Sequence, residues 1–110
     1  MFGSKQDKIQ KAVEKKKVAS VVKFLEDKDR DVVLAALKGL GSITGDDSFN
    51  ALVPFLSSTD ADFRAAAAAS LGEIGNAHAK AFLLHAITIE KDEKVKKAME
   101  QANGKLKEHH

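Results

Sequence analysis

Few side chains in this sequence have the types and spacing that catalysis or metal binding requires. His78 and His85 lie seven residues apart, so a helix would place both on one face. A metal site needs further converging ligands, and no acidic residue stands between His78 and Glu90. We therefore expect two surface or partly buried imidazoles, and neither a metal nor another cofactor.

The serine, acidic and glycine patterns do not form catalytic motifs either. Ser57, Ser58 and Ser70 lack the Gly-x-Ser-x-Gly surroundings of a hydrolase nucleophile. The neighbouring acids Asp46 and Asp47 are better explained as helix caps, and either one is placed to cap the next helix. The glycines follow helices instead of opening them, so they do not form a phosphate loop. The chain has no cysteine, which excludes thiolate catalysis and disulfide bonds. These patterns predict a non-enzymatic protein.

A repeat of about 31 residues organises the chain. The segment from Asp29 to Thr44 recurs 31 positions later, from Asp60 to Gly75. A weaker third copy begins at Asp92, after a shift of 32. Each copy opens on an aspartate that can cap a helix and continues with small and apolar residues at helical spacing. Internal repeats of this period are typical of a solenoid.

The pattern predicts an all-α fold, namely a short α-solenoid of about three antiparallel helix pairs. We expect a single domain over residues 1–108, with repeats at about 16–45, 46–75 and 76–108, and interpret His109 and His110 as a tag remnant. A long first helix is expected over Lys5 to Asp27, either continuous or kinked near its three consecutive lysines. Further helices are expected at about Asp31–Ser42, Ser48–Ser57, Asp60–Ile74, Ala77–Ile89 and Glu93–Glu108.

Matching positions of the copies predict the core. Pro54 lies inside an expected helix and should kink or tighten it. Ala81, Leu83 or Leu84, and Ile87 are expected on the buried side of the Ala77–Ile89 helix. The residues expected to be buried at equivalent places are Phe24, Leu25, Ala36, Leu40, Phe55, Leu56, Ala67 and Leu71.

Composition and charge limit the range of partners. Hydrophobic residues make up 44% of the chain and the net charge is +2, which is too small to indicate nucleic acid. The first 28 residues and the last 35 are basic, whereas the middle is acidic. No apolar run is long enough to span a membrane, so we expect a cytoplasmic protein. The last expected helix has one apolar stripe, as a terminal repeat does, and this favours a monomer.

The segment from Asp60 to Gly75 resembles the HEAT-like repeat named after phycobilisome lyases. The resemblance covers about residues 16–104 and implies the solenoid, but such repeats serve many roles. It also implies that arginines link successive repeats through aspartates. Arg64 stands at the arginine position, with Asp31 or Asp62 as its expected partner.

The resemblance further implies that the second helix of each pair lines a concave side, where another protein binds. A helix or an extended peptide would lie there, anchored by Leu34 and Leu37 and oriented by Arg64 and Lys97. The alternative for the two leucines is packing under the N-terminal helix. Two other functions stay open: a nucleic-acid-associated protein that uses its lysine clusters, and an accessory subunit of a chromophore lyase. The expected partner-binding residues are Val33, Leu34, Leu37, Lys38, Arg64, Ala65, Ala68, Lys96 and Lys97.

Overall fold

The computed structural model describes residues 4–106, and the regular secondary structure of this part of the chain is all helical, without a strand. His109 and His110 lie outside the described residues. The all-α expectation is confirmed. The α-helices are α1 (Lys5–Glu14), α2 (Val18–Val22), α3 (Arg30–Leu40), α4 (Asp46–Leu52), α5 (Ala61–Ile74), α6 (Ala79–Ile89) and α7 (Glu93–Lys105). The 3-10 helices are η1 (Lys23–Glu26) and η2 (Val53–Ser57).

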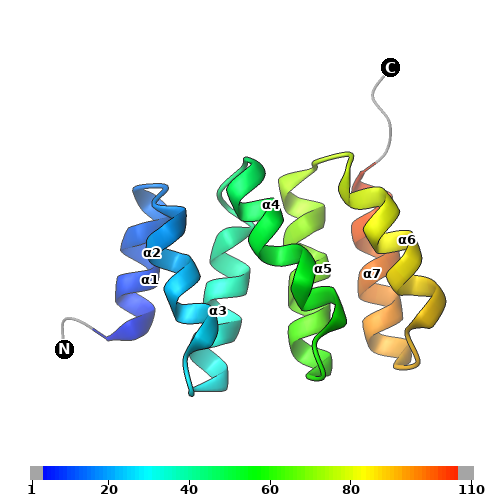
Figure 1. Cartoon of the computed structure of the whole chain (residues 1–110), viewed down its shortest axis with the longest axis horizontal. Helices are drawn as coiled ribbons and strands as arrows, with labels where there is room; N and C mark the ends of the chain where they lie inside the picture. The colour runs from blue at the N-terminus through cyan, green and yellow to red at the C-terminus, as the bar shows by residue number, and fades with distance from the viewer. Residues whose placement is uncertain (1–3, 107–110) are drawn as a thin grey trace.

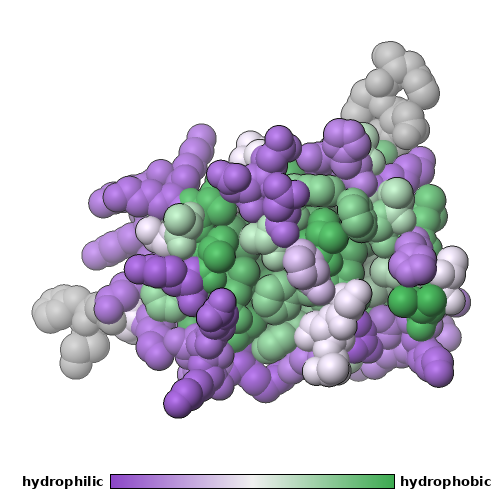
Figure 2. Space-filling model, viewed as in Figure 1, coloured by the Kyte–Doolittle hydropathy of each residue, from purple (hydrophilic) through white to green (hydrophobic). Residues whose placement is uncertain are grey.

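The helices form two layers, which Figure 1 shows stacked along the long axis of a 42 × 32 × 17 Å molecule. One layer contains α1, α3, α5 and α7, each packed against the next, and we call these the second helices. The other layer contains α2–η1, α4–η2 and α6, which we call the first helices. Figure 2 views the first-helix layer and shows polar surface around its rim and apolar surface across its middle. The molecule is a short α-solenoid.

The N-terminal segment is a helical hairpin and not one long helix. The chain reverses at Lys15–Lys17, where Lys16 has a left-handed φ of 57°. After this turn α1 lies beside α3, just as α3 lies beside α5, and buries Ile9 and Ala12. Helix α1 therefore stacks as a second helix ahead of the three pairs.

Equivalent aspartates start three of the second helices. Each carboxylate accepts a hydrogen bond from the backbone N–H two residues later, at 2.9 Å, which satisfies an amide that the helix leaves unpaired. The capping residues are Asp29, Asp60 and Asp92. The cap expected for α4 is wrong: Gly45 is its N-cap, and Asp46 and Asp47 lie in the first turn, where the helix dipole favours acids.

A short 3-10 segment ends two of the three first helices. Helix α4 tightens into η2 around Pro54, as expected, but α2 tightens into η1 around Lys23, the equivalent position without a proline. Helix α6 stays α-helical to Ile89.

The core follows most of the matching positions. Ala36, Leu40, Ala67 and Leu71 are fully buried and Leu56 is 7% exposed. Three of the expected core residues are only half-buried and pack at its edge: Phe24, Leu25 and Phe55. In α6 the buried side is that of Leu83, whereas Ala81 and Leu84 are exposed, because residues one position apart point about 100° away from each other.

Glycines bring neighbouring second helices into close contact. A Cβ atom added to Gly41 would lie 2.7 Å from Ser70 Oγ of α5. One added to Gly72 would lie 2.9 Å from the Cα atom of Ala102 in α7. Ser70 Oγ also donates a buried hydrogen bond of 2.7 Å to the carbonyl oxygen of Leu37. Residues with small or no side chains therefore set the distance between α3 and α5 and between α5 and α7.

Replacing Gly72 with alanine is expected to destabilise the fold. The new methyl group would meet the α7 backbone, and such overpacking lowers the free energy of unfolding by about 1–3 kcal/mol. Gly104 is the control because a Cβ atom there meets nothing within 4 Å. Gly104→Ala should raise the free energy of unfolding by roughly 0.5–1 kcal/mol. Urea denaturation measures both, and a Gly72→Ala variant as stable as the parent would contradict the close packing.

Candidate partner-binding surface

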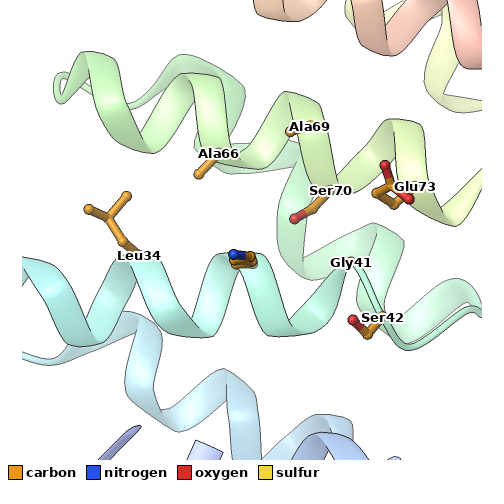
Figure 3. Close-up of a pocket in the computed structure, with 8 residues that line it drawn as sticks. Leu34, Gly41, Ser42, Ala66, Ala69, Ser70 and Glu73 are labelled. Carbon is orange, nitrogen blue, oxygen red and sulfur yellow. The ribbon is translucent and has the colours of Figure 1, made fainter. Parts of the chain in front are cut away.

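A hollow lies between α3 and α5, on the side away from the first helices. Its volume is about 630 Å³. Figure 3 shows Leu34 rising from α3 toward α5, from which Ala66 and Ser70 project. The lining residues are Leu34, Lys38, Gly41, Ser42, Ala66, Ala69, Ser70 and Glu73.

Two smaller hollows continue it on both sides. The one between α1 and α3 has a volume of about 450 Å³ and shares Lys38 and Ser42 with the central hollow. The one between α5 and α7 has a volume of about 80 Å³ and shares Ala69. The three hollows lie side by side across the four second helices, and we call them together the second-helix groove.

The repeat explains the small side chains of this groove. Ala35, Ala66 and Ala98 occupy the same position of successive copies, and each lines one of the hollows. Alanine favours the helix and leaves space above the backbone. The charged residues at the groove are of both signs, with Lys38 on α3 and an ion pair between Glu73 and Lys105 across α5 and α7. The groove therefore has a nearly neutral floor of small residues.

Three of the expected binding residues are buried, so the expectation that they line the surface is wrong. Val33 is 3% exposed, and Leu37 and Ala68 are fully buried. Val33 and Leu37 lie on the same helical stripe as Gly41, which contacts α5. Ala68 shares a stripe with Gly72, which contacts α7. These positions form the interface between successive repeats and not the outer surface.

The other expected residues divide between the groove and its edge. Leu34 and Lys38 line the central hollow. Ala65 is half-buried on α5; on α7, Lys96 is half-buried and Lys97 is exposed. Three further lining residues were missed in the sequence: Ser42, Ala66 and Glu73.

Arg64 links two repeats instead of facing a partner. Its guanidinium donates two hydrogen bonds of 2.9 Å to the carboxylate of Glu90, and a third to the carbonyl oxygen of Ser58. The Glu90 side chain is only 4% exposed. The hydrogen bonds with Arg64 lower the pKa of Glu90, and those with Glu90 raise the pKa of Arg64. The expected pairing with Asp31 or Asp62 is wrong.

Arg30 forms the equivalent link one repeat earlier. It donates to both carboxylate oxygens of Asp60 at 2.8 and 2.9 Å, and to Asp62 at 2.8 Å. The hydrogen bond from Arg30 is the main cause that lowers the pKa of Asp60 to about 2. This interaction stabilises the fold above the ordinary pKa of an aspartate and is lost as the pH falls toward 2. Its signal in the sequence is the 30-residue separation, which is close to the repeat period.

A third link joins the start of α1 to the turn before α3, since Lys5 contacts Asp27 at 2.8 Å. Asp27, Ser58 and Glu90 occupy equivalent positions, and each side chain also accepts from the backbone N–H two residues later. Ser58 cannot form an ion pair, so Arg30 uses Asp60 and Asp62. The three links form a ladder along the edge where α3, α5 and α7 begin.

Comparison with known families agrees with this geometry. A family model for HEAT repeats matches residues 15–103. The chain belongs to the HEAT repeat family. No curated protein matches the sequence. HEAT repeats generally mediate contacts between proteins and are generally non-enzymatic.

Within residues 4–106, the HEAT pairs bring together no group of side chains that could hold a metal ion. His78 and His85 are both exposed, and no group of three or more histidine, cysteine or acidic side chains converges there. In the same region, none of the helices combines the length and apolarity that a membrane crossing requires.

The two lysine runs lie far apart on the HEAT solenoid. Lys15–Lys17 form the turn between α1 and α2, whereas Lys94, Lys96 and Lys97 begin α7. Figure 1 places these segments at opposite corners of the molecule. They therefore do not combine into one basic surface.

Proposed function

We propose that this chain is a non-enzymatic interaction module that binds another protein along the second-helix groove. The supporting observation is that neighbouring hollows share lining residues across four helices, with alanine, glycine and serine among those residues. Bound segments in such grooves gain from close approach to the backbone and from a few apolar anchors. The narrower placement among repeats of the phycobilisome lyase type rests on the Asp60–Gly75 motif and is part of this proposal.

The partner segment is a short helix or an extended peptide with an apolar side chain. Leu34 is the one large apolar residue among those that line the central hollow, and it stands opposite Ala66. An apolar anchor between these two residues would remove both from water. Lys38 and Glu73 flank this place with opposite charges, and Lys97 lies at the α7 side. A partner with neither strong positive nor strong negative charge suits this surface better than nucleic acid.

The test uses a peptide selected from a random-sequence phage library on the immobilised chain. Ala69→Arg fills the groove at the residue that two hollows share, so we expect the Kd of the selected peptide to rise at least about tenfold. Ala19→Arg is the control, because Ala19 is also an exposed helical alanine but belongs to α2 in the other layer. The Kd of the selected peptide for Ala19→Arg should equal its Kd for the parent chain. Equal affinities in all three proteins would rule out the groove.

A salt titration of the same peptide complex separates this function from nucleic-acid binding. Phosphate contacts release counterions, so such binding weakens steeply with salt. Groove binding through an apolar anchor should change little over the same range. Tight, steeply salt-dependent binding of a DNA or RNA oligonucleotide would instead favour the nucleic-acid function.

A further inference from the structure

Matching positions of the second helices form a row of exposed side chains. Lys38, Ala69 and Gln101 match one another through the repeat shifts of 31 and 32, and all three are exposed. Lys38 lines the hollows on both sides of α3, and Ala69 lines the hollows on both sides of α5. We call this set of positions the crest row. It leads across the second helices from one hollow to the next.

Helix α1 adds Gln10 to the crest row. A Cβ atom added to Gly39 of α3 would lie 2.8 Å from a methyl group of Val13 in α1. The position that matches Gly39 on α5 is Ser70, and the residue of α3 that approaches Ser70 is Gly41. Val13 is therefore the counterpart of Gly41, 28 residues earlier. The same separation from the crest position of α3 gives Gln10, which is exposed and lines the hollow between α1 and α3.

Three of the four crest positions carry long side chains that donate hydrogen bonds. Gln10 and Gln101 end in uncharged amides, and Lys38 ends in an ammonium group. Within residues 4–106, none of these three groups has a hydrogen-bond or ion-pair partner. The fourth position is Ala69, which lies on α5 beside the central hollow that Leu34 enters (Figure 3). The crest row therefore places donors on both sides of an apolar centre.

The charges along the hollows determine what a partner presents to Lys38. The charged residues that line the three hollows are Glu14, Lys38, Glu73 and Lys105. Glu73 and Lys105 pair with each other, whereas Glu14 and Lys38 have no ion-pair partner in the described part of the chain. Lys38 lies at the central hollow, and Glu14 lies one helix away on α1. A complementary partner therefore carries an acidic residue near the central hollow and has any basic residue toward α1.

The spacing of the second helices matches an extended chain that repeats every three residues. Packed helices lie about 8–10 Å apart, and the contacts of Gly41 and Gly72 keep these helices close. A polyproline II chain rises about 3.1 Å per residue with three residues per turn, so every third side chain recurs after about 9 Å. A β-strand returns to the same face after about 7 Å, which fits this spacing less well. A polyproline II chain can therefore direct one side chain into each successive hollow.

The unpaired donors favour an extended chain over a helix. The main-chain groups inside an α-helix bond to one another, whereas a polyproline II chain has no internal hydrogen bonds and leaves its carbonyl oxygens free. The amides of Gln10 and Gln101 can donate to such carbonyl oxygens. These two residues lie three helix spacings apart, or roughly 27 Å. About nine residues of polyproline II chain cover this distance, whereas an α-helix needs about eighteen.

We propose that the partner segment in the second-helix groove is a polyproline II peptide of about nine residues that follows the crest row across the four second helices. An apolar residue of the peptide lies beside Leu34 in the central hollow, and an acidic residue one or two positions away pairs with Lys38. Gln10 and Gln101 donate to its carbonyl oxygens toward the two ends. This inference rests on the proposed function and selects the extended peptide over the short helix.

The conformation of the bound peptide tests the inference directly. The library-selected peptide, isotopically labelled, would be studied by NMR on the unlabelled chain. We expect strong sequential Hα–HN contacts, none of the i,i+3 contacts of a helix, and HN–Hα couplings that correspond to φ of about −75°. A helical or β-extended peptide whose affinity still falls in Ala69→Arg would overturn this inference and leave the proposed function intact. A peptide whose affinity Ala69→Arg does not change would overturn both.

Two variants of the crest row provide a second, independent measurement. Gln101→Leu removes a donor at similar size, and we expect the Kd of the selected peptide to rise about threefold to tenfold. Asn50→Leu is the matched control, because Asn50 is an exposed amide on α4 in the other layer, and the Kd should not change. Lys38→Glu should weaken the peptide by a similar factor, and replacing the acidic residue of the peptide by lysine should restore its affinity for this variant.

Circular dichroism checks that the three variants fold. Equal affinities for Gln101→Leu and Asn50→Leu would overturn the contact between the crest row and the peptide main chain. Selected peptides without an acidic residue beside the apolar one, or affinity that the charge exchange does not restore, would overturn the pairing with Lys38.

Discussion

Replacing Leu71 by alanine is expected to lower the free energy of unfolding by about 2–5 kcal/mol. Leu71 is fully buried near the end of α5, the helix that packs between α3 and α7. Its removal leaves a cavity that the closely spaced second helices cannot close, because Gly41 and Gly72 already hold them in contact. Urea denaturation of the parent and the variant measures the difference.

The matched control is Leu84→Ala on α6. Leu84 has the same side chain but is 46% exposed, so its truncation should change the free energy of unfolding by less than about 0.5 kcal/mol. If the two alanine variants lose similar stability, the two-layer packing described for α5 and α6 is wrong.

Replacing Arg64 by alanine is expected to lower the free energy of unfolding by about 3 kcal/mol. The change leaves the Glu90 carboxylate, whose side chain is 4% exposed, without its cation. It also removes the donor to the carbonyl oxygen of Ser58. Adding Glu90→Gln to Arg64→Ala should recover part of the loss, because the buried charge is then gone.

Arg30→Ala is the control at the neighbouring repeat junction. The Arg30 side chain is 52% exposed, so its ion pair is screened by water and its loss should lower the free energy of unfolding clearly less than the loss of Arg64 does. Acid provides a further check. The pKa of Glu90 is lowered in the fold, so the pair stabilises above the ordinary glutamate pKa and its contribution is lost as the pH falls through the lowered value. The loss in free energy of unfolding that Arg64→Ala causes should therefore become smaller in acid. An equal loss at all pH values would contradict the ion-pair link.

The repeat period made the fold predictable from the sequence. A capping aspartate and the apolar and small residues that follow it recur at Asp29, Asp60 and Asp92, and the structure starts a second helix at each of them. These signals are local, since a cap and a helical stripe depend on residues within a few positions of each other. The break at Lys15–Lys17 has no such signal. No glycine or proline marks it, and Lys16 takes the left-handed conformation because α1 must turn back beside α2.

The binding surface was harder to predict because a second helix inside a stack has neighbours on three sides. Leu37 and Lys38 are adjacent in α3, yet Leu37 is fully buried against α5 while Lys38 lines the groove. An apolar stripe identifies the side that faces the first helices but not the sides that face the next repeats. The ladder was missed for a related reason. Arg30 lies outside the position where the family carries its arginine, and its partner Asp60 is a repeat away.

The most direct measurement is to map the contact of the library-selected peptide on the isotopically labelled chain. NMR backbone amide shifts would be recorded as the peptide is added. We predict that the largest shifts fall on residues of the second-helix groove, around Leu34, Lys38, Ala69 and Glu73, and that α2 and α6 change little. Shifts confined to the first helices, with none in the groove, would contradict the assignment of the second helices as the partner-binding side.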